Sequence, residues 1–316
     1  MEKLIIIGSG PAGYTAAIYA ARAHLSPLVI AGQFLGGQVA SSFEVGNYPG
    51  FPEDINGAEL AQRMHKQAER FGTRFELDIV TGVDLSQHPF KVMTYGEEYE
   101  ALSLIVTSGA SPRKLRVPGE SEFAGRGVSY CATCDGFFYT GKQIVVVGGG
   151  DAAIEEALFL TRYADKVTVI HRRDQLRAEP VLQHRAFQND KIRFLWNTAV
   201  SEILGGGMVT DLRLQNVKSG EESIFATQGV FVAVGYIPNT EFLGGQLALN
   251  ENGYIVTDEH ARTSVEGVWA AGDVSDWFYR QIATSVGTGA RAAMQVEQYI
   301  ARLEDRVYPG EAAPEK

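Results

Sequence analysis

The sequence has few of the features that mark disulfide-bonded, nucleic-acid-binding or disordered proteins. Only two of its 316 residues are cysteines, which excludes a framework of disulfides. Basic residues number 28 against 38 acidic residues, and the net charge of −10 makes nucleic acid a poor partner. Apolar residues make up 45% and charged residues 21%, so the chain is not mainly disordered. The length predicts two domains.

One uncharged run near the start raises the question of a membrane segment. No charged residue lies between Leu4 and Ala21, and a hydropathy window could assign a spanning helix or a signal peptide to this run. The glycine-rich segment Gly8–Gly13 in its middle would break a helix, and Met1-Glu2-Lys3 is not a basic leader. We therefore expect a strand, a turn and a helix here, no membrane partner, and a cytoplasmic location.

Glycine, in contrast, is abundant: the 35 glycines amount to about 11%, where about 7% is usual. Two glycine-rich turns lie inside strand–turn–helix–strand patterns of the βαβ type. Strands are predicted at 3–7, 27–31, 143–147 and 166–170, and helices at 12–23 and 151–163. Two such units predict two nucleotide sites, and an enzyme with two nucleotides usually moves electrons between them.

The first turn has the full G-x-G-x-x-G spacing between a strand and a helix. Gly8 would permit the turn, Gly10 would let a pyrophosphate approach the backbone, and Gly13 would allow the helix to pack closely on the strand. A purely structural turn stays the alternative. No acidic residue follows the second strand, so the ribose contact there would come from the backbone or from Gln33.

The second turn, Gly148–Ala153, is the G-x-G-x-x-A variant. Where an NAD site would place a carboxylate, the chain has His171, Arg172 and Arg173, with Arg177 following. Guanidinium groups at this position suit the 2′-phosphate of NADPH through charge and bidentate geometry. The alternative is a solvated basic loop.

Two segments rich in proline and glycine, 111–119 and 235–245, are expected to be linkers. The tail after the second linker is too short for a domain of its own, with a strand at 267–270, a turn at 271–273 and a helix at 281–301. We therefore predict an α/β fold of two Rossmann-like, three-layer dinucleotide-binding domains, in which the second is inserted into a discontinuous first.

Cys131 and Cys134 form a C-x-x-C pair followed by Asp135. Zinc would need four ligands, and the six histidines are scattered, so no metal site is expected. A redox pair is favoured over two unconnected cysteines. Asp135 could protonate a thiolate if burial raises the pKa of its carboxyl group, or it could simply form a turn with Gly136. Asp273, after the last strand, could likewise bind a sugar hydroxyl or only form a turn.

Taken together, these motifs closely resemble the bacterial low-molecular-weight thioredoxin reductases. The resemblance covers essentially the whole chain, and its most specific part is the run Cys131–Tyr139. It implies a homodimer in which residues 1–115 and 244–316 bind FAD, and residues 116–243 bind NADPH and carry a redox-active disulfide. It further implies that Cys134 faces the flavin, Cys131 attacks the disulfide of thioredoxin, and Asp135 is a general acid.

The resemblance also assigns binding residues. Those for FAD are Gly8, Ser9, Gly10, Pro11, Ala12, Gly13, Gly32, Gly37, Gln38, Asn47, Asp273, Arg280, Gln281 and Ile282. Those for NADPH are Gly150, Asp151, Ala152, Ala153, His171, Arg172, Arg173 and Arg177. The sequence departs from the family at Ala152, where Ser or Thr is usual, so one hydroxyl contact to the nucleotide is in doubt.

Arg126, Phe137 and Phe138 lie close to the cysteines in sequence, and such a composition is typical of an interface hot spot. We expect thioredoxin to dock there, although both phenylalanines could instead be core residues. Because the redox pair and the NADPH turn lie between the same linkers, the two domains are expected to alternate between two arrangements.

Other hypotheses remain open at this point. A reductase of a peroxidase system would carry an extra N-terminal region, and a reductase for a glutaredoxin-like protein or one fed by ferredoxin is harder to exclude. A nucleotide-sensing protein with inactive cysteines would bind nucleotide without producing thiols.

Overall fold

The structure is a computed structural model that describes residues 1–42 and 45–306. Its contacts divide the chain into two units. The first comprises Met1–Ser42, Tyr48–Ser111 and the chain from Ile237 on; the second comprises Pro112–Tyr236 and a short segment that ends at Asn47. The unit boundaries thus lie a few residues before the expected ones, at 115/116 and 243/244.

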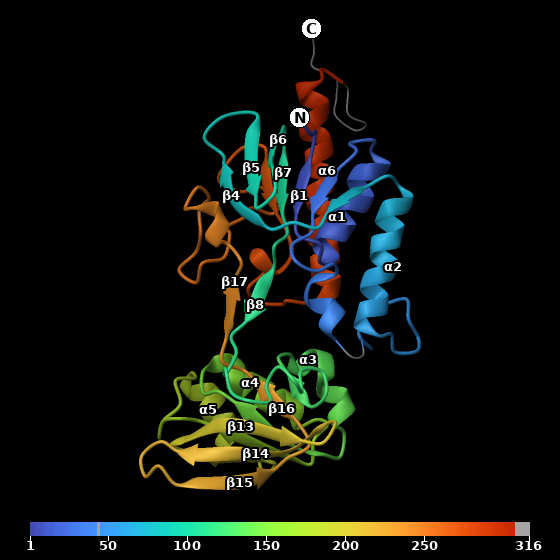
Figure 1. Ribbon diagram of the computed structural model, residues 1–316. Helices are drawn as coiled ribbons and strands as arrows, with labels where there is room; N and C mark the ends of the chain where they lie inside the picture. Colours follow the sequence, from blue (N-terminus) through green and yellow to red (C-terminus); the bar gives the residue numbers. More distant parts are fainter. Residues whose placement is uncertain (43–44, 307–316) are drawn as a thin grey trace. The chain divides into compact units, whose positions relative to one another are not determined.

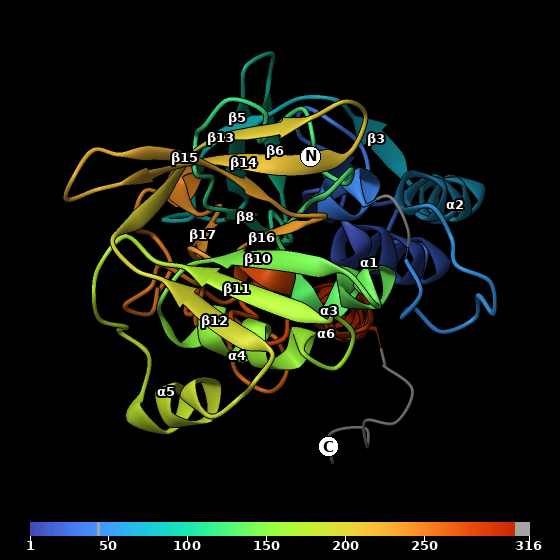
Figure 2. The same ribbon diagram turned by 90° about the horizontal axis from the view of Figure 1, so that it is seen from below.

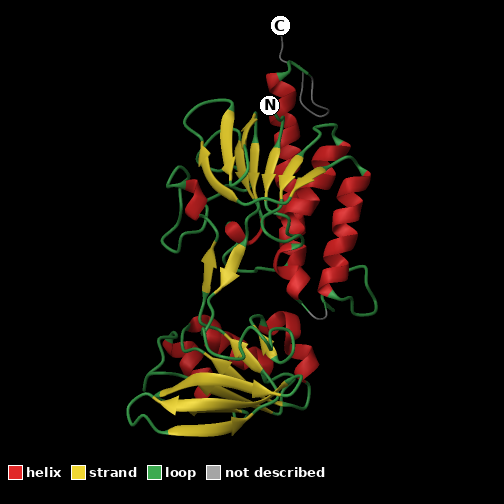
Figure 3. Ribbon diagram, in the orientation of Figure 1, coloured by secondary structure: helices red, strands yellow, loops and turns green. Residues whose placement is uncertain are grey.

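The first unit is built on a five-stranded parallel sheet with the order β18-β7-β1-β2-β3. Figure 1 labels β1 and β7 of this sheet, and Figure 3 draws its strands in yellow. Its strands are β1 (Ile5–Ile7), β2 (Leu28–Ile30), β3 (Arg74–Glu76), β7 (Leu104–Val106) and β18 (Val268–Ala270). The three central strands are wholly buried, as expected for a parallel sheet that is covered on both faces.

The two faces of this sheet are covered differently. On one side pack α1 (Pro11–Arg22), α2 (Gly57–Arg70) and α6 (Ile282–Leu303), against residues such as Ile6 and Val29. On the other side lies the antiparallel sheet of β4 (Val80–Asp84), β5 (Phe90–Thr94) and β6 (Glu98–Ala101), against Ile5 and Ile7. Successive side chains of a strand point to opposite faces, so β1 contributes to both cores and the unit has three layers.

The second unit repeats this plan with other elements (Figure 2). Its parallel sheet, in the order β12-β11-β10-β16-β9, is formed by β9 (Val128–Ser129), β10 (Gln143–Val147), β11 (Lys166–Ile170), β12 (Ile192–Leu195) and β16 (Val230–Val232). The helices α3 (Ala132–Asp135), α4 (Asp151–Leu160) and α5 (Pro180–Phe187) belong to the core on one face. The antiparallel sheet of β13 (Thr198–Gly205), β14 (Val209–Asn216) and β15 (Glu222–Ala226) covers the other.

Two short strands, β8 (Ala110–Pro112) and β17 (Tyr236–Pro238), pair with each other where the chain passes between the units. Short 3₁₀ turns complete the structure: η1 (Gly37–Ser41), η2 (Gly136–Tyr139), η3 (Glu241–Leu243) and η4 (Gly272–Val274). Within the described residues, no helix is both long and apolar enough to cross a membrane.

The α/β class with parallel sheets is confirmed, and most of the expected βαβ elements lie within one or two residues of their predicted bounds. The helix expected at 151–163 ends earlier, at Leu160. Its last residues form tighter bonds instead, from Arg162 N to Phe159 O and from Tyr163 N to Leu160 O, a common ending of α-helices.

Candidate active site

The first glycine turn, between β1 and α1, has the shape that a dinucleotide requires. Gly8 has a φ of +113°, and a Cβ atom there would lie 2.4 Å from the Thr107 carbonyl oxygen. At Gly13 a Cβ atom would lie 2.0 Å from the Gly8 carbonyl oxygen, so helix and strand can only approach this closely without a side chain. At Gly10 a Cβ atom would meet nothing within 4 Å. This open space lies at the N-terminus of α1.

The N-terminus of α1 is suited to an anion. Its N-cap is Gly10, no side chain caps it, and its first turn contains no acidic residue. Pro11 at the first helical position has no N–H group, and the backbone N–H groups of Ala12 and Gly13 follow it. Free N–H groups and the helix dipole both favour a phosphate at this end.

The last strand of the sheet brings Asp273 to the same end. The strands β1, β7 and β18 are parallel neighbours, so their carboxyl ends share one edge. Gly272, with a φ of +76°, lies against α1: a Cβ atom at this position would be 2.9 Å from the Ala12 Cβ. Asp273 accepts a hydrogen bond of 3.2 Å from the hydroxyl of Ser285 on α6.

The carboxyl group of Asp273 titrates unusually. Burial raises its pKa to about 6, and the negative charge of Asp276 adds to this; the Ser285 hydrogen bond and the positive charge of Arg280 act in the opposite direction. A half-buried carboxyl group held near a dinucleotide turn can bind a sugar or ribityl hydroxyl, as either donor or acceptor.

The remaining flavin candidates are spread over three segments. The Ser9 hydroxyl donates to the Ala31 carbonyl, beside Gly32, and a Cβ atom at Gly37 would lie 3.0 Å from the Gly10 Cα. The side-chain amide of Gln38 donates to the Ala110 carbonyl. These contacts hold the segment 32–38 over the glycine turn.

Asn47 does not belong to the first unit; it ends the short segment that belongs to the second. Arg280 has a φ of +49°, Gln281 is the N-cap of α6 and takes part in a capping box with Thr284, and Ile282 is the first residue of the helix. The predicted start of this helix near 281 is thus one residue early.

The second glycine turn, between β10 and α4, repeats the geometry of the first. A Cβ atom at Gly148 would lie 2.5 Å from the Ala233 carbonyl oxygen and 2.6 Å from the Ala153 Cβ, whereas Gly150 again has nothing within 4 Å. Gly150 is the N-cap of α4 without a side-chain cap. Asp151 lies in the first turn of α4, and its carboxylate accepts a 2.7 Å hydrogen bond from the Glu179 N–H.

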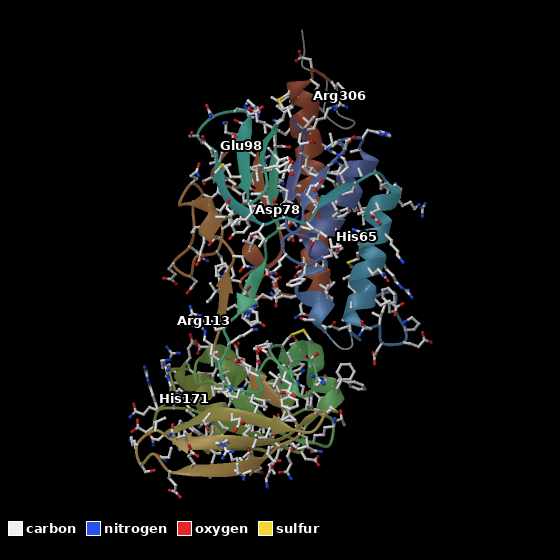
Figure 4. The ribbon with its side chains drawn as sticks, viewed as in Figure 1. His65, Asp78, Glu98, Arg113, His171 and Arg306 are labelled. Carbon is white, nitrogen blue, oxygen red and sulfur yellow. A yellow bond between two sulfur atoms is a disulfide. The ribbon has the colours of Figure 1, made fainter. Side chains whose placement is uncertain are left out.

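His171, which is labelled in Figure 4, lies against this turn, and the backbone of Arg177 is bonded to it. A Cβ atom at Gly149 would lie 2.3 Å from the His171 ring, and the backbone N–H of Arg177 donates to the Gly149 carbonyl at 2.7 Å. His171 is buried, and its pKa is lowered by burial and by the charges of Arg173 and Arg177. Among the described residues, nothing hydrogen-bonds its Nε2 atom.

Both turns therefore fit a dinucleotide. Each has an open glycine at an uncapped helix N-terminus, and the second also has a buried nitrogen, Nε2 of His171, with no hydrogen-bond partner in the described part of the chain. Arg172, Arg173 and Arg177 are exposed, which leaves their guanidinium groups accessible to a phosphate. The first turn has no such basic group at the end of β2, where Ala31 and Gly32 follow.

Cys131 and Cys134 form a disulfide (Figure 4, yellow bond). Cys131 is the N-cap of α3, and its sulfur accepts a hydrogen bond of 3.2 Å from the Cys134 N–H. The Asp135 N–H donates to the Cys131 carbonyl at 3.1 Å. Because β9, β16 and β10 are parallel, the redox pair leaves the sheet at the edge that also carries the second glycine turn. No group of metal ligands occurs in the part of the chain that the structure describes.

Burial raises the pKa of Asp135, and a hydrogen bond from Ser129 partly offsets this. The Ser129 hydroxyl donates to Asp135 Oδ2 at 2.5 Å and accepts from the Cys131 N–H at 3.1 Å. The sequence alone gives Ser129 no role, because no spacing rule links a strand residue to a carboxyl group across a turn. Only its place two residues before the first cysteine could have drawn attention to it.

The candidate docking residues differ in exposure. Phe137 is 66% exposed and lies with its ring centroid 6.0 Å from that of Phe138. Phe138 is half-buried and packs on the core beside α4. Arg126 is exposed, and its guanidinium group donates to the Glu122 carbonyl. Phe137 is therefore a surface residue, whereas Phe138 also belongs to the core.

Known proteins are similar to the chain over nearly its whole length. The model of the pyridine nucleotide-disulphide oxidoreductase family matches residues 2–295. The thioredoxin reductase of Rickettsia conorii is 50% identical over 94% of this chain and 98% of its own length. That of Streptomyces coelicolor is 49% identical over 100% of this chain and 98% of its own. The chain belongs to the thioredoxin reductase family.

Solved structures of thioredoxin reductases are also similar to this chain over nearly its whole length. The thioredoxin reductase of Streptococcus pyogenes is 46% identical, with a TM-score of 0.91 over 95% of this chain and 98% of that one. The enzyme of Giardia duodenalis is 40% identical, with a TM-score of 0.89 over 95% and 98%. The predicted family, the two dinucleotide-binding folds and the class of enzyme are thereby confirmed. The chain is an NADPH-dependent flavoprotein disulfide oxidoreductase, and FAD and NADPH are its cofactors.

Proposed function

We propose that this enzyme reduces the disulfide of a thioredoxin, and that electrons pass from NADPH to FAD, then to the Cys131–Cys134 disulfide, and finally to the partner. The observation that carries the proposal is the disulfide beside Asp135, a carboxyl group whose pKa is raised by burial. The names of relatives at about half identity over nearly the whole chain support thioredoxin as the partner.

The two glycine turns would hold the cofactors. Residues of the first unit, the turn Gly8–Gly13 with Asp273, would hold FAD; the second turn with His171 and the arginines would hold NADPH. When bound, NADPH supplies two electrons as a hydride, and FAD passes two electrons to a disulfide. The exposed guanidinium groups select the 2′-phosphate, and the open glycines let the pyrophosphates reach the backbone.

The exchange with thioredoxin is balanced by two proton transfers. Cys131 gives its thiol proton to the Asp135 carboxylate and attacks one partner sulfur; the partner disulfide breaks, and Asp135 protonates the sulfur that leaves. Cys134 then gives its proton to Asp135 and attacks the Cys131 sulfur. This reforms the Cys131–Cys134 disulfide and releases the second partner sulfur, which Asp135 protonates. Two electrons and two protons have moved to the partner.

A raised pKa suits Asp135 to this role. At its ordinary pKa, near 4, the carboxyl group would be ionised at neutral pH and a poor acid. Burial favours the neutral form and brings the pKa of Asp135 closer to the pH at which the enzyme works.

Thioredoxin would dock on Phe137, Phe138 and Arg126, which follow or precede the cysteines closely in the chain.

Three further parts of the proposal concern the whole protein. The two units would alternate between two arrangements, since the redox pair must meet first the flavin and then a whole protein. The segments 111–119 and 235–245, which contain most of β8 and β17, would act as hinges. The enzyme would be a homodimer in the cytoplasm.

The test is NADPH oxidation with a panel of disulfide acceptors: thioredoxin, a glutaredoxin-like protein, glutathione disulfide and a small aromatic disulfide. We expect rapid NADPH oxidation with thioredoxin and not with the other acceptors. The Cys131→Ser variant should oxidise no NADPH with any of them. NADPH-driven bleaching of the flavin without reduction of any acceptor would contradict the proposal and favour nucleotide sensing. Cross-linking the units in one arrangement should stop turnover; a locked protein that still reduces thioredoxin at full speed would show that no alternation is needed.

A further inference from the structure

Ser129 is the residue of the redox segment that the proposed mechanism leaves without a role. It ends β9, is buried, and lies two residues before Cys131. Its hydroxyl oxygen is 2.5 Å from Asp135 Oδ2, 3.1 Å from the Cys131 nitrogen and 3.4 Å from the Cys131 carbonyl oxygen. One hydroxyl group therefore contacts both the carboxyl group and the backbone of the attacking cysteine.

We propose that Ser129 is a positioning residue for disulfide exchange, which holds the Asp135 carboxyl group beside the redox pair and keeps it hydrogen-bonded in both of its protonation states. This inference rests on the proposed function, in which Asp135 takes up and returns a proton. Ser129 itself gains and loses no proton over a turnover.

The three contacts allow two hydrogen-bond patterns with the same heavy-atom positions. A serine hydroxyl can donate one hydrogen bond and accept two. While Asp135 is ionised, the hydroxyl donates to Oδ2 and accepts from the Cys131 N–H. Once Asp135 is protonated, the carboxylic acid donates to the Ser129 oxygen, and the hydroxyl proton turns to the Cys131 carbonyl. Neither pattern leaves the half-buried carboxyl group of Asp135 unpaired, which would be costly.

The strand end that carries Ser129 is itself held in place. The Tyr236 hydroxyl donates to the Tyr130 carbonyl at 2.6 Å, and the Tyr130 hydroxyl donates to the buried Glu120 at 3.1 Å. Tyr130 lies between Ser129 and Cys131, so these bonds fix the backbone from which the Ser129 side chain reaches Asp135. A positioning role requires such a rigid support.

Other titratable groups lie on the elements that pack against α3. They are Tyr139 of η2 and Asp151, Glu155 and Glu156 of α4. The pKa of Tyr139 is raised by burial and, to a lesser extent, by the Asp135 charge. These groups are the same in every variant compared below, so a shift between variants reports the Ser129 hydroxyl.

The test compares Ser129→Ala, which lacks the hydroxyl, with Ser129→Thr, which keeps it. Because the exchange begins with an ionised Asp135, the pKa of this group sets the acidic limb of kcat/KM for thioredoxin. The Ser129 hydrogen bond lowers that pKa, so Ser129→Ala should move the acidic limb to higher pH. The plateau value of kcat/KM should fall about tenfold, which is less than the roughly 10²–10⁴-fold that a general acid contributes. Ser129→Thr should keep both the plateau value and the pH limb of the wild-type enzyme. An unshifted limb in a folded, flavin-loaded Ser129→Ala would overturn the inference.

Two controls keep the test decisive. Ser103→Ala removes another buried hydroxyl, which donates to the Lys3 carbonyl at 2.6 Å in the first unit, and should leave the pH profile unchanged. If Ser129→Ala does not fold, amide hydrogen exchange of the wild-type holoenzyme decides: the Cys131 amide should exchange slowly, and exchange at the rate of an unstructured peptide would overturn the inference. Wild-type enzyme that reduces other disulfides but not thioredoxin would contradict the proposed function alone.

Discussion

The backbone N–H of Arg177 donates a 2.7 Å hydrogen bond to the carbonyl of Gly149. This bond ties an arginine that follows β11 to the glycine turn that follows β10. Since Arg172 and Arg173 also follow β11, the bond places the loop of three guanidinium groups beside the N-terminus of α4. We therefore propose that the phosphates of one nucleotide contact both the helix N-terminus and the arginines.

The first prediction concerns the choice of nucleotide. Replacing Arg172 and Arg173 by alanine should lower kcat/KM for NADPH by about 10- to 100-fold per arginine, because a hydrogen bond to a charged group contributes roughly 1.5–3 kcal/mol. The value for NADH should stay nearly constant. Lys166→Ala, at the opposite end of β11, removes one positive charge as a control. A double variant that keeps the wild-type preference would show that the arginines do not read the 2′-phosphate.

The second prediction separates the glycines that bind from those that pack. An alanine at Gly10 would meet no protein atom, whereas at Gly13 its Cβ would lie 2.0 Å from the Gly8 carbonyl oxygen. Gly10→Ala should therefore fold with nearly unchanged stability but retain little FAD. Gly13→Ala should lose both FAD and stability, by several kcal/mol, through forced displacement of α1. Flavin absorbance per protein and thermal unfolding measure the two effects.

A glycine elsewhere serves as the matched control for this pair. At Gly206, between β13 and β14, an added Cβ atom would also meet nothing within 4 Å, and the backbone has no positive φ. Gly206→Ala should change neither FAD content nor stability appreciably. Full flavin loading of Gly10→Ala would mean that the pyrophosphate does not approach this turn.

How far the sequence predicts the structure depends on how local each signal is. The turns at Gly8 and Gly148 were predicted because their glycine spacing, the preceding apolar strand and the following helix lie within one short segment. The antiparallel sheets were not predicted. The strand β15 is mostly exposed, with Phe225 as its half-buried residue, so it carries no alternating apolar pattern; it is a strand because it pairs with β14.

The same distinction applies to the site. The chemistry of Cys131, Cys134 and Asp135 was predicted from residue types at fixed spacing. The bond from Ser285 to Asp273 joins a turn to a separate helix, and the contact between Gly272 and Ala12 spans most of the chain. Such relationships depend on the order of strands in the sheet, which no short motif states.

The third prediction concerns docking. Phe137→Ala should raise KM for thioredoxin about tenfold or more, as expected for an exposed aromatic hot spot, and should leave thermal stability and the KM for a small disulfide unchanged. Phe138→Ala should in addition destabilise the second unit, because its half-buried ring packs on the core. Phe187→Ala, another exposed phenylalanine of this unit, is the control. Equal effects of Phe137→Ala on both acceptors would count against docking.

The last prediction follows from the pKa of Asp273, which burial raises to about 6. An aspartate in the unfolded chain has a pKa near 4, so the folded state disfavours the charged form. The free-energy cost that the ionised carboxylate imposes on folding is absent below a pH of about 4, grows between pH of about 4 and about 6, and stays constant at higher pH. Asp273→Asn should therefore stabilise the flavin-free protein at pH 7 by about 1–3 kcal/mol, by no more than a few tenths at pH 4, and should weaken FAD binding. Urea unfolding at both pH values measures this, with the exposed Asp190→Asn as the control. An equal gain at both pH values, or none at pH 7, would show that Asp273 carries no such cost.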